Sequence, residues 1–327
     1  MQSYYTFNGV GRPYTMARPS DEAAEFLKNS YSADFLNFQK RALEKAIAGD
    51  SAGLEQVRSK RRISEYDLSS VRLDEVFSKD LNRMRIYRPK SEAKTPRKAV
   101  LYLHGGGWAI NSPETCERFC RDIVLREDLV VVAPDYRLAP ENKYPASCID
   151  AKRAYGWMLE NGGRLGIDVE KIFLAGDSSG GHLAFHLAID LRDDAAPMPA
   201  GVIAFYPPTD LISTRERKTF NIFGEGYSLN GELMELFIKA YAPDKKSLEG
   251  ASLLNKNLSG LPPSLIVMGE CDILRDEAQE FYAKLSKLSK SRYVCFEGAV
   301  HAFITQKSMD GAYERALCEF GEFIRGN

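Results

Sequence analysis

From Lys98 onward, hydrophobic positions recur as short and nearly continuous runs, separated by longer stretches of helical character. The runs read AVLYLHGG, LVVVAPDY, KIFLAGDS, GVIAFYP and SLIVMGE. Runs of this length that are rich in branched residues are typical of strands buried on both faces. The stretches at 146–160, 179–192 and 275–289 favour helices between the strands. This alternation predicts a mostly parallel sheet with helices on both sides.

Other parts of the chain depart from this alternation. The first sixty residues favour one or two amphipathic helices, and a later stretch favours a helix without a clear strand. SVRLDEVFSK and NRMRIYRPK alternate apolar and polar residues, which predicts an antiparallel pair ahead of the parallel strands. We therefore expect an α/β fold with about eight strands, an antiparallel start and a helical cap. The expected segments are an N-terminal helical cap segment, a first core part, a cap insertion and a second core part, at 1–60, 61–210, 211–255 and 256–327.

Composition and charge narrow the choice of class. The chain has 327 residues, of which 44% are hydrophobic and 27% charged, as in soluble globular proteins. A formal net charge of −1 gives no reason to expect nucleic acid or an anionic membrane as a partner. The N-terminus lacks a basic start followed by an apolar run, so no secretory signal is predicted. Six cysteines are too sparse for a disulfide scaffold, which favours free thiols and a cytoplasmic location.

Two pairs of residues invite a metal-site interpretation. Cys116 and Cys120 are one helical turn apart, and so are His182 and His186. Neither pair has a third ligand at a usual spacing, which a zinc site requires. The sequence therefore predicts packing roles and no metal. It also lacks a dinucleotide or P-loop motif, so no cofactor is expected.

The segment GDSSG presents a candidate nucleophile, Ser178. It fits the pattern G-x-S-x-G, with a buried strand at 172–175 before it and a helix after it. On such a turn the serine adopts a strained backbone conformation, and the glycines two residues away avoid collisions with the strand and the helix. A tight turn without any chemistry is the alternative interpretation of these five residues.

A serine hydroxyl needs a neighbouring base, which an acid in turn orients. Of the four histidines, His182 and His186 lie in the helix after the serine and point away from the turn. His104 opens a glycine run. His301 follows the last expected strand, at the edge where active sites of α/β proteins assemble. We therefore take His301 as the candidate base.

The candidate acid is Asp272, which comes directly after the strand PSLIVMGE. Asp276 falls inside the next helix, and Glu270 is too close to the strand to reach outward. The alternative role for Asp272 is to cap that helix. The chain order serine, aspartate, histidine and the α/β pattern both exclude a trypsin-like protease.

The segment HGGGW, residues 104–108, also follows a strand and precedes the serine. A chain without side chains can bring consecutive backbone N–H groups against a developing oxyanion. We expect the N–H groups of Gly105 and Gly106 to form an oxyanion hole together with that of Ser179.

These motifs resemble the hormone-sensitive-lipase branch of the α/β-hydrolases, which comprises bacterial carboxylesterases and acetyl esterases. The resemblance covers roughly residues 65–327 and rests on HGGGW, DYRLAPENKYPAS, GDSSGG, DILRDEA and GAVHAF. It implies an α/β-hydrolase fold with a variable cap, and a homodimer formed through the last strand. The residues to which it assigns the nucleophile, acid, base and oxyanion hole are Ser178, Asp272, His301, and Gly105, Gly106 and Ser179.

The expected activity is that of a serine carboxylesterase acting on small-molecule esters without a cofactor. Bulky aromatic residues near the cap predict a short pocket and therefore short acyl chains. We expect Trp108, Tyr206 and Phe223 to contact the substrate. Two alternatives remain open: a ligand-binding module, as in the related plant gibberellin receptors that have lost the base histidine, and a deacetylase of sugar esters or amides.

Overall fold

The structure is a computed structural model that describes residues 4–6, 17–29, 32–78, 81–306 and 308–327. A single twisted sheet runs through it, with the strand order β1-β9-β8-β7-β6-β4-β5-β3-β2 among these residues. The strands are β1 (Tyr4–Thr6), β2 (Val71–Ser78), β3 (Leu81–Pro89), β4 (Arg97–Leu103), β5 (Val130–Pro134), β6 (Ile167–Asp177), β7 (Gly201–Phe205), β8 (Ser264–Cys271) and β9 (Ser291–Val300).

The strand directions confirm the predicted α/β fold. Strands β4 to β9 pair in parallel with one another. Along one edge of the sheet, β2 pairs antiparallel with β3, and β3 pairs antiparallel with β5. Every residue of β5, β7 and β8 is buried, as expected for strands covered on both faces. The predicted antiparallel hairpin ahead of the parallel part is therefore correct.

Strand β1 adds to the expected eight strands at the other edge. It pairs antiparallel with β9, with Tyr4 opposite Phe296 and Thr6 opposite Val294. The segment 1–60 thus contains a strand of the sheet as well as helices. An unpaired sheet edge exposes a row of N–H and C=O groups, and even a short strand satisfies several of them. β1 also occupies part of the edge that dimerisation through the last strand would use.

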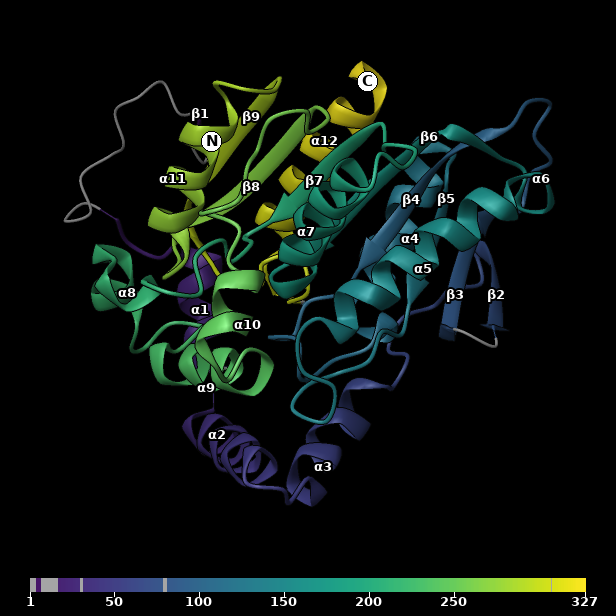
Figure 1. The fold of residues 1–327 in the computed structure, drawn as a ribbon. Helices are drawn as coiled ribbons and strands as arrows, with labels where there is room; N and C mark the ends of the chain where they lie inside the picture. The colour runs from purple at the N-terminus through teal and green to yellow at the C-terminus, as the bar shows by residue number, and fades with distance from the viewer. Residues whose placement is uncertain (1–3, 7–16, 30–31, 79–80, 307) are drawn as a thin grey trace.

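Helices cover both faces of the sheet (Figure 1). Helices α5, α7 and α11 pack on one face, and α4 and α12 pack together on the other. The helices at 146–160, 179–192 and 275–289 are confirmed, the last one ending four residues earlier than expected, at Leu285. The helices of the two layers are α4 (Glu117–Glu127), α5 (Ala146–Glu160), α6 (Gly162–Leu165), α7 (Ser179–Asp193), α11 (Arg275–Leu285) and α12 (Asp310–Gly326).

The remaining helices come from the two cap segments, near the N-terminus and in the insertion, and gather below the sheet in Figure 1. Helix α2 packs against α9, where Lys40 donates to Glu232 over 2.6 Å. Within the described residues no helix is both long and apolar enough to cross a bilayer. These helices are α1 (Asp21–Asn29), α2 (Ala33–Ile47), α3 (Ala52–Arg61), α8 (Lys218–Phe223), α9 (Gly231–Tyr241) and α10 (Lys245–Ala251), with short 3-10 turns η2 (Pro113–Cys116) and η3 (Thr214–Glu216).

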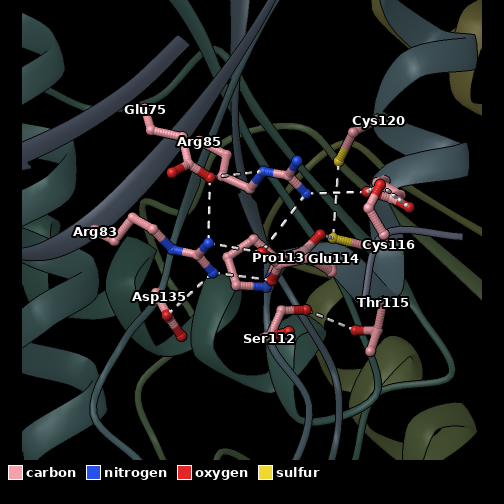
Figure 2. A network of polar contacts seen from close by, with 12 residues as sticks. Glu75, Arg83, Arg85, Ser112, Pro113, Glu114, Thr115, Cys116, Cys120 and Asp135 are labelled. Carbon is pink, nitrogen blue, oxygen red and sulfur yellow. Dashed lines mark hydrogen bonds and ion pairs between the residues drawn. The ribbon is translucent and has the colours of Figure 1, made fainter. Parts of the chain in front are cut away.

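A charged cluster ties the antiparallel edge of the sheet to the start of α4 (Figure 2). From β3, Arg83 contacts Glu114 at 2.7 Å and Arg85 contacts Glu117 at 3.0 Å. Glu75 of β2 lies beside both arginines. Arg85 and Glu117 are both buried, and an ion pair away from water contributes only when its geometry and hydrogen bonds are good.

Glu117 meets that condition because it also holds the chain that leaves α3. Its carboxylate accepts hydrogen bonds from the Ser64 hydroxyl at 2.9 Å and from the backbone N–H groups of Glu65 and Tyr66 at 2.8 and 3.2 Å. One buried carboxylate therefore fixes the N-terminal cap segment to the core.

We predict that Glu117→Ala lowers the free energy of unfolding by about 3–5 kcal/mol, because it leaves the buried Arg85 without its nearest carboxylate. Glu75→Ala is the matched control. Its side chain is 40% exposed, so its loss should cost less than about 1 kcal/mol. Urea unfolding of both variants measures the difference, and equal small losses would contradict the assignment.

Candidate active site

Ser178 occupies a sharp turn between β6 and α7. Its backbone has φ 52° and ψ −124°, a conformation that non-glycine residues rarely adopt. The flanking glycines make the turn feasible. A Cβ on Gly180 would collide with the carbonyl oxygen of Leu103, and a Cβ on Gly176 would collide with the backbone of Gly180. The strained turn that the sequence predicts is therefore present. Its glycines are needed for the predicted reason, because a side chain there would collide with the adjoining strand or helix.

The structure brings the three predicted polar residues together. Nε2 of His301 lies 2.9 Å from Oγ of Ser178, and its Nδ1 lies 2.7 Å from Oδ2 of Asp272. Asp272 is 1% exposed and also accepts a hydrogen bond from the N–H of Leu274 at 2.9 Å. The three side chains form a continuous hydrogen-bonded relay that leads from a buried carboxylate to the serine.

The carboxylates that were set aside lie elsewhere. Asp276 accepts a hydrogen bond from the N–H of Thr219, and Glu270 accepts one from the N–H of Gly298. Both connect segments of backbone, whereas the carboxylate within hydrogen-bond distance of His301 is that of Asp272.

The other histidines have structural partners. His182 accepts from the indole N–H of Trp108 at 3.2 Å and donates from Nε2 to the carbonyl oxygen of Ala251 at 2.8 Å. Burial lowers the pKa of His182 to about 3, so the ring is neutral and both contacts hold. His104 stacks on Tyr136 with 4.2 Å between ring centres. His182 thus fixes the glycine loop through Trp108.

The glycine loop corrects one prediction. The N–H of Gly105 donates to Oδ1 of Asp177 at 3.1 Å, so it is not free to meet a substrate. Gly106 and Gly107 line the cavity beside Ser178 and Ser179. The assignment of Gly105 was wrong because the residue preceding the serine is an acid, which takes the first amide of the loop. Gly107, the third glycine of the run, was not among the predicted donors.

Asp177 itself is an unusual carboxylate. It is buried, and its Oδ1 also accepts a hydrogen bond from the hydroxyl of Tyr102 at 3.1 Å. Burial raises the pKa of Asp177 to about 6. This side chain joins the end of β6 to the loop after β4, and so sets the distance between the serine and the glycines.

A cavity of about 130 Å³ opens over Ser178 and His301. Trp108 lines it, whereas Tyr206 and Phe223 do not. Tyr206 is buried against the His301 ring at 4.7 Å between centres, and Phe223 is buried against Tyr227. Both support neighbouring groups and do not reach the cavity.

The apolar wall of the cavity comes from the insertion. The residues of this wall are buried, and they lie along α9 and in the turn before it. They were not among the residues predicted to contact the substrate. The periodic apolar positions of α9 are the signal that could have identified them. They are Leu229, Leu233, Met234 and Phe237.

The two cysteines one turn apart are buried beside the charged cluster. The sulfur atoms of Cys116 and Cys120 lie 3.8 Å apart, and burial raises the pKa of the Cys116 thiol. Among the residues that the structure describes, no three His, Cys, Asp or Glu side chains gather as a metal site would need.

Residues 100–305 match the model of a family described as having the alpha/beta hydrolase fold. The chain belongs to this family. An arylesterase of Saccharolobus solfataricus is 31% identical over 301 residues, which are 86% of this chain and 91% of that protein. An ethyl acetate hydrolase of Pseudomonas putida is 32% identical over 234 residues, covering 69% of this chain and 72% of that protein.

Solved structures give the same result. A thermostable esterase from Pseudomonas putida superposes with a TM-score of 0.80 at 25% identity, over 95% of this chain and 97% of that one. A thermophilic and thermostable carboxylesterase cloned from a metagenomic library gives a TM-score of 0.76 at 33% identity, over 83% and 95%. These matches confirm the family resemblance that the motifs indicated.

The raised pKa of Asp177 predicts a pH-dependent stability. The folded protein holds the proton up to about pH 6, whereas the unfolded chain loses it near 3.8, so folding is favoured at low pH and this contribution is lost as the pH rises. Relative to Asp177→Asn, which keeps an acceptor oxygen without the charge, the wild type should lose about 2 kcal/mol between pH 4.5 and 7.5.

Urea unfolding at the two pH values measures this relative change. Other titrating groups are common to both proteins and cancel in the difference. An equal pH dependence of the two proteins would mean that Asp177 has an ordinary pKa.

Proposed function

We propose that this protein is a serine carboxylesterase that hydrolyses short-chain acyl esters at Ser178. The observation that carries the proposal is the relay from Asp272 through His301 to the serine oxygen, which ends in a cavity that Gly106, Gly107 and Ser179 line. The chain is a carboxylic ester hydrolase, in agreement with relatives named as an arylesterase and an ethyl acetate hydrolase.

In the proposed mechanism His301 takes the proton of Ser178 as the serine oxygen attacks the ester carbonyl. Asp272 accepts the Nδ1–H bond, which leaves Nε2 of His301 free as the base. His301 then gives its proton to the departing alcohol. Water attacks the acyl-enzyme by the same route and releases the acid.

The negative charge of the tetrahedral intermediate needs donors that are already in position. The proposed donors are the backbone N–H groups of Gly106, Gly107 and Ser179, which border the cavity. Ser179 opens α7, so the positive end of that helix also favours an anion here.

Several parts of this arrangement support short acyl chains. Ligand sites for drug-sized molecules have volumes of about 300–1,000 Å³, and the cavity at Ser178 is much smaller. Phe237 packs directly against Gly107, where a Cβ would meet its ring, and so closes the cavity beside the proposed donors. Acyl groups beyond a few carbons would need the insertion to move.

Ser178→Ala should reduce ester turnover by about 10³- to 10⁶-fold while the protein remains folded, because no other group can form the acyl-enzyme. Hydrolysis of p-nitrophenyl acetate and labelling by an organophosphonate measure the loss. Retained activity in the variant would refute Ser178 as the nucleophile. A wild type that binds esters without turnover would favour the ligand-binding alternative, and faster cleavage of anilides than of esters the amide-deacetylase one.

The acyl preference should lie between acetyl and about hexanoyl. Each added methylene gains about 0.8 kcal/mol only while it finds apolar surface, so kcat/KM should rise or hold over the first carbons and then fall. A series of p-nitrophenyl esters from acetate to dodecanoate tests this. The highest rate with dodecanoate, or a jump in rate when substrate forms micelles, would contradict a short pocket.

A further inference from the structure

Arg61, the last residue of α3, carries a partly buried guanidinium that makes no hydrogen bond to any residue in the described part of the chain. Its side chain lies over the ring of Phe35, 5.7 Å from the ring centre. Its backbone carbonyl accepts a hydrogen bond from the Ser112 hydroxyl at 3.0 Å. Burial lowers the pKa of Arg61, opposed by the nearby charge of Glu65, but an arginine keeps its charge at neutral pH.

The neighbouring Arg58 is an arginine with a structural role in this cap, and its hydrogen bonds offer a comparison. Its guanidinium donates to the carbonyl oxygens of Ala109 and Ala139 at 2.9 and 2.7 Å, and to Glu141 at 2.8 Å. A buried cation normally has such partners, since leaving its donors unpaired is unfavourable. Among the described residues Arg61 has no such hydrogen-bond partner, so its guanidinium can donate to a ligand.

The backbone holds Arg61 firmly from both sides. Arg58 ties α3 to the loop after β4 one turn earlier, and Glu117 holds the backbone of 64–66 just after it. The fold therefore fixes the backbone that carries the cation, and the Phe35 ring lies beneath its side chain. A group positioned in advance loses less entropy when it binds a ligand.

Arg61 borders the substrate cavity. It lines the cavity of about 130 Å³ that holds Ser178 and also an adjoining cavity of about 430 Å³. The two cavities share Asn111, Thr305 and Gln306 as further lining residues. Arg61 thus lies where a substrate that reacts at Ser178 would extend into the larger space.

The larger cavity combines apolar rings with positive charge. Phe26 and Phe35 lie on its wall beside Lys60. Of its acids, Glu114 is neutralised by Arg83 at 2.7 Å, which leaves Glu65 to oppose the two cations. The surface suits an aromatic group that carries a negative charge.

We propose that Arg61 binds a carboxylate on the alcohol part of the substrate, and that the preferred substrates are short-chain acyl esters of aromatic hydroxy acids. The inference rests on the proposed esterase function. The small cavity takes the acyl group, and the larger one takes the aromatic alcohol. A guanidinium matches a carboxylate with two parallel hydrogen bonds, and partial burial strengthens the pair. Hydrolysis adds water across the ester bond and releases the short acid and the hydroxy acid.

The test compares 4-acetoxybenzoate, which is anionic, with 4-acetoxybenzamide, which is neutral and has the same shape. The kcat and KM of both are measured for the wild type, Arg61→Gln and Arg62→Gln. Arg62 is the matched control because it is exposed and lines neither cavity. Comparing the anionic-to-neutral ratio between proteins cancels the difference in leaving group.

We expect this ratio of kcat/KM to fall about 10- to 100-fold in Arg61→Gln, mainly through KM, and to stay within about 2-fold in Arg62→Gln. Added salt should lower the ratio in the wild type, and Arg61→Lys should give an intermediate value. Labelling of each variant by an organophosphonate verifies a folded active site.

An unchanged ratio in Arg61→Gln, with the neutral ester still hydrolysed, would overturn the role of Arg61 and leave the esterase function standing. Failure of the wild type to hydrolyse either ester or to react with the phosphonate would overturn both. Misfolding of Arg61→Gln together with an unchanged ratio in Arg61→Lys and no salt effect in the wild type would also overturn the role.

Discussion

The close approach of α7 to the end of β4 is the contact on which the site depends. Gly180 lies against the carbonyl oxygen of Leu103 with no space for a side chain. The approach forces the strained backbone at Ser178 and also brings the glycine loop alongside it. Asp177 then fixes the loop by accepting the N–H of Gly105. Serine and backbone amides are thus set by packing, before any substrate binds.

The sequence could predict those parts of the site that are fixed by local structure. Ser178, Asp272 and His301 each follow a strand with a clear apolar run, and parallel strands bring such positions to one edge. Gly105 was misassigned because its partner, Asp177, lies 72 residues away and no local pattern records the hydrogen bond. Tyr206 and Phe223 were misplaced because aromatic character alone does not distinguish a cavity wall from the layer behind it.

The cap was the least predictable part, for a related reason. Its helices come from the N-terminal segment and from the insertion, and amphipathic periodicity reveals a buried face without identifying the element that covers it. The sequence does not distinguish Arg61 from Arg58, because it does not show which arginine has hydrogen-bond partners. The difference between them is seen only in the structure. Strand β1 is too short for a pattern of its own, and it forms because β9 offers an edge.

The pairing of the first strand with the last has a consequence for how the chain folds during synthesis. Tyr4 lies opposite Phe296, so β1 leaves the ribosome with its partner strand still almost three hundred residues away. Helix α2 likewise cannot pack against α9 until α9 has been synthesised, since Lys40 and Glu232 are 192 residues apart. At about 5–20 residues per second, translation takes on the order of ten seconds or more to supply these partners. Strand β1 must therefore remain unpaired until β9 has been made, and the cap closes over the site only after α9 of the insertion has emerged.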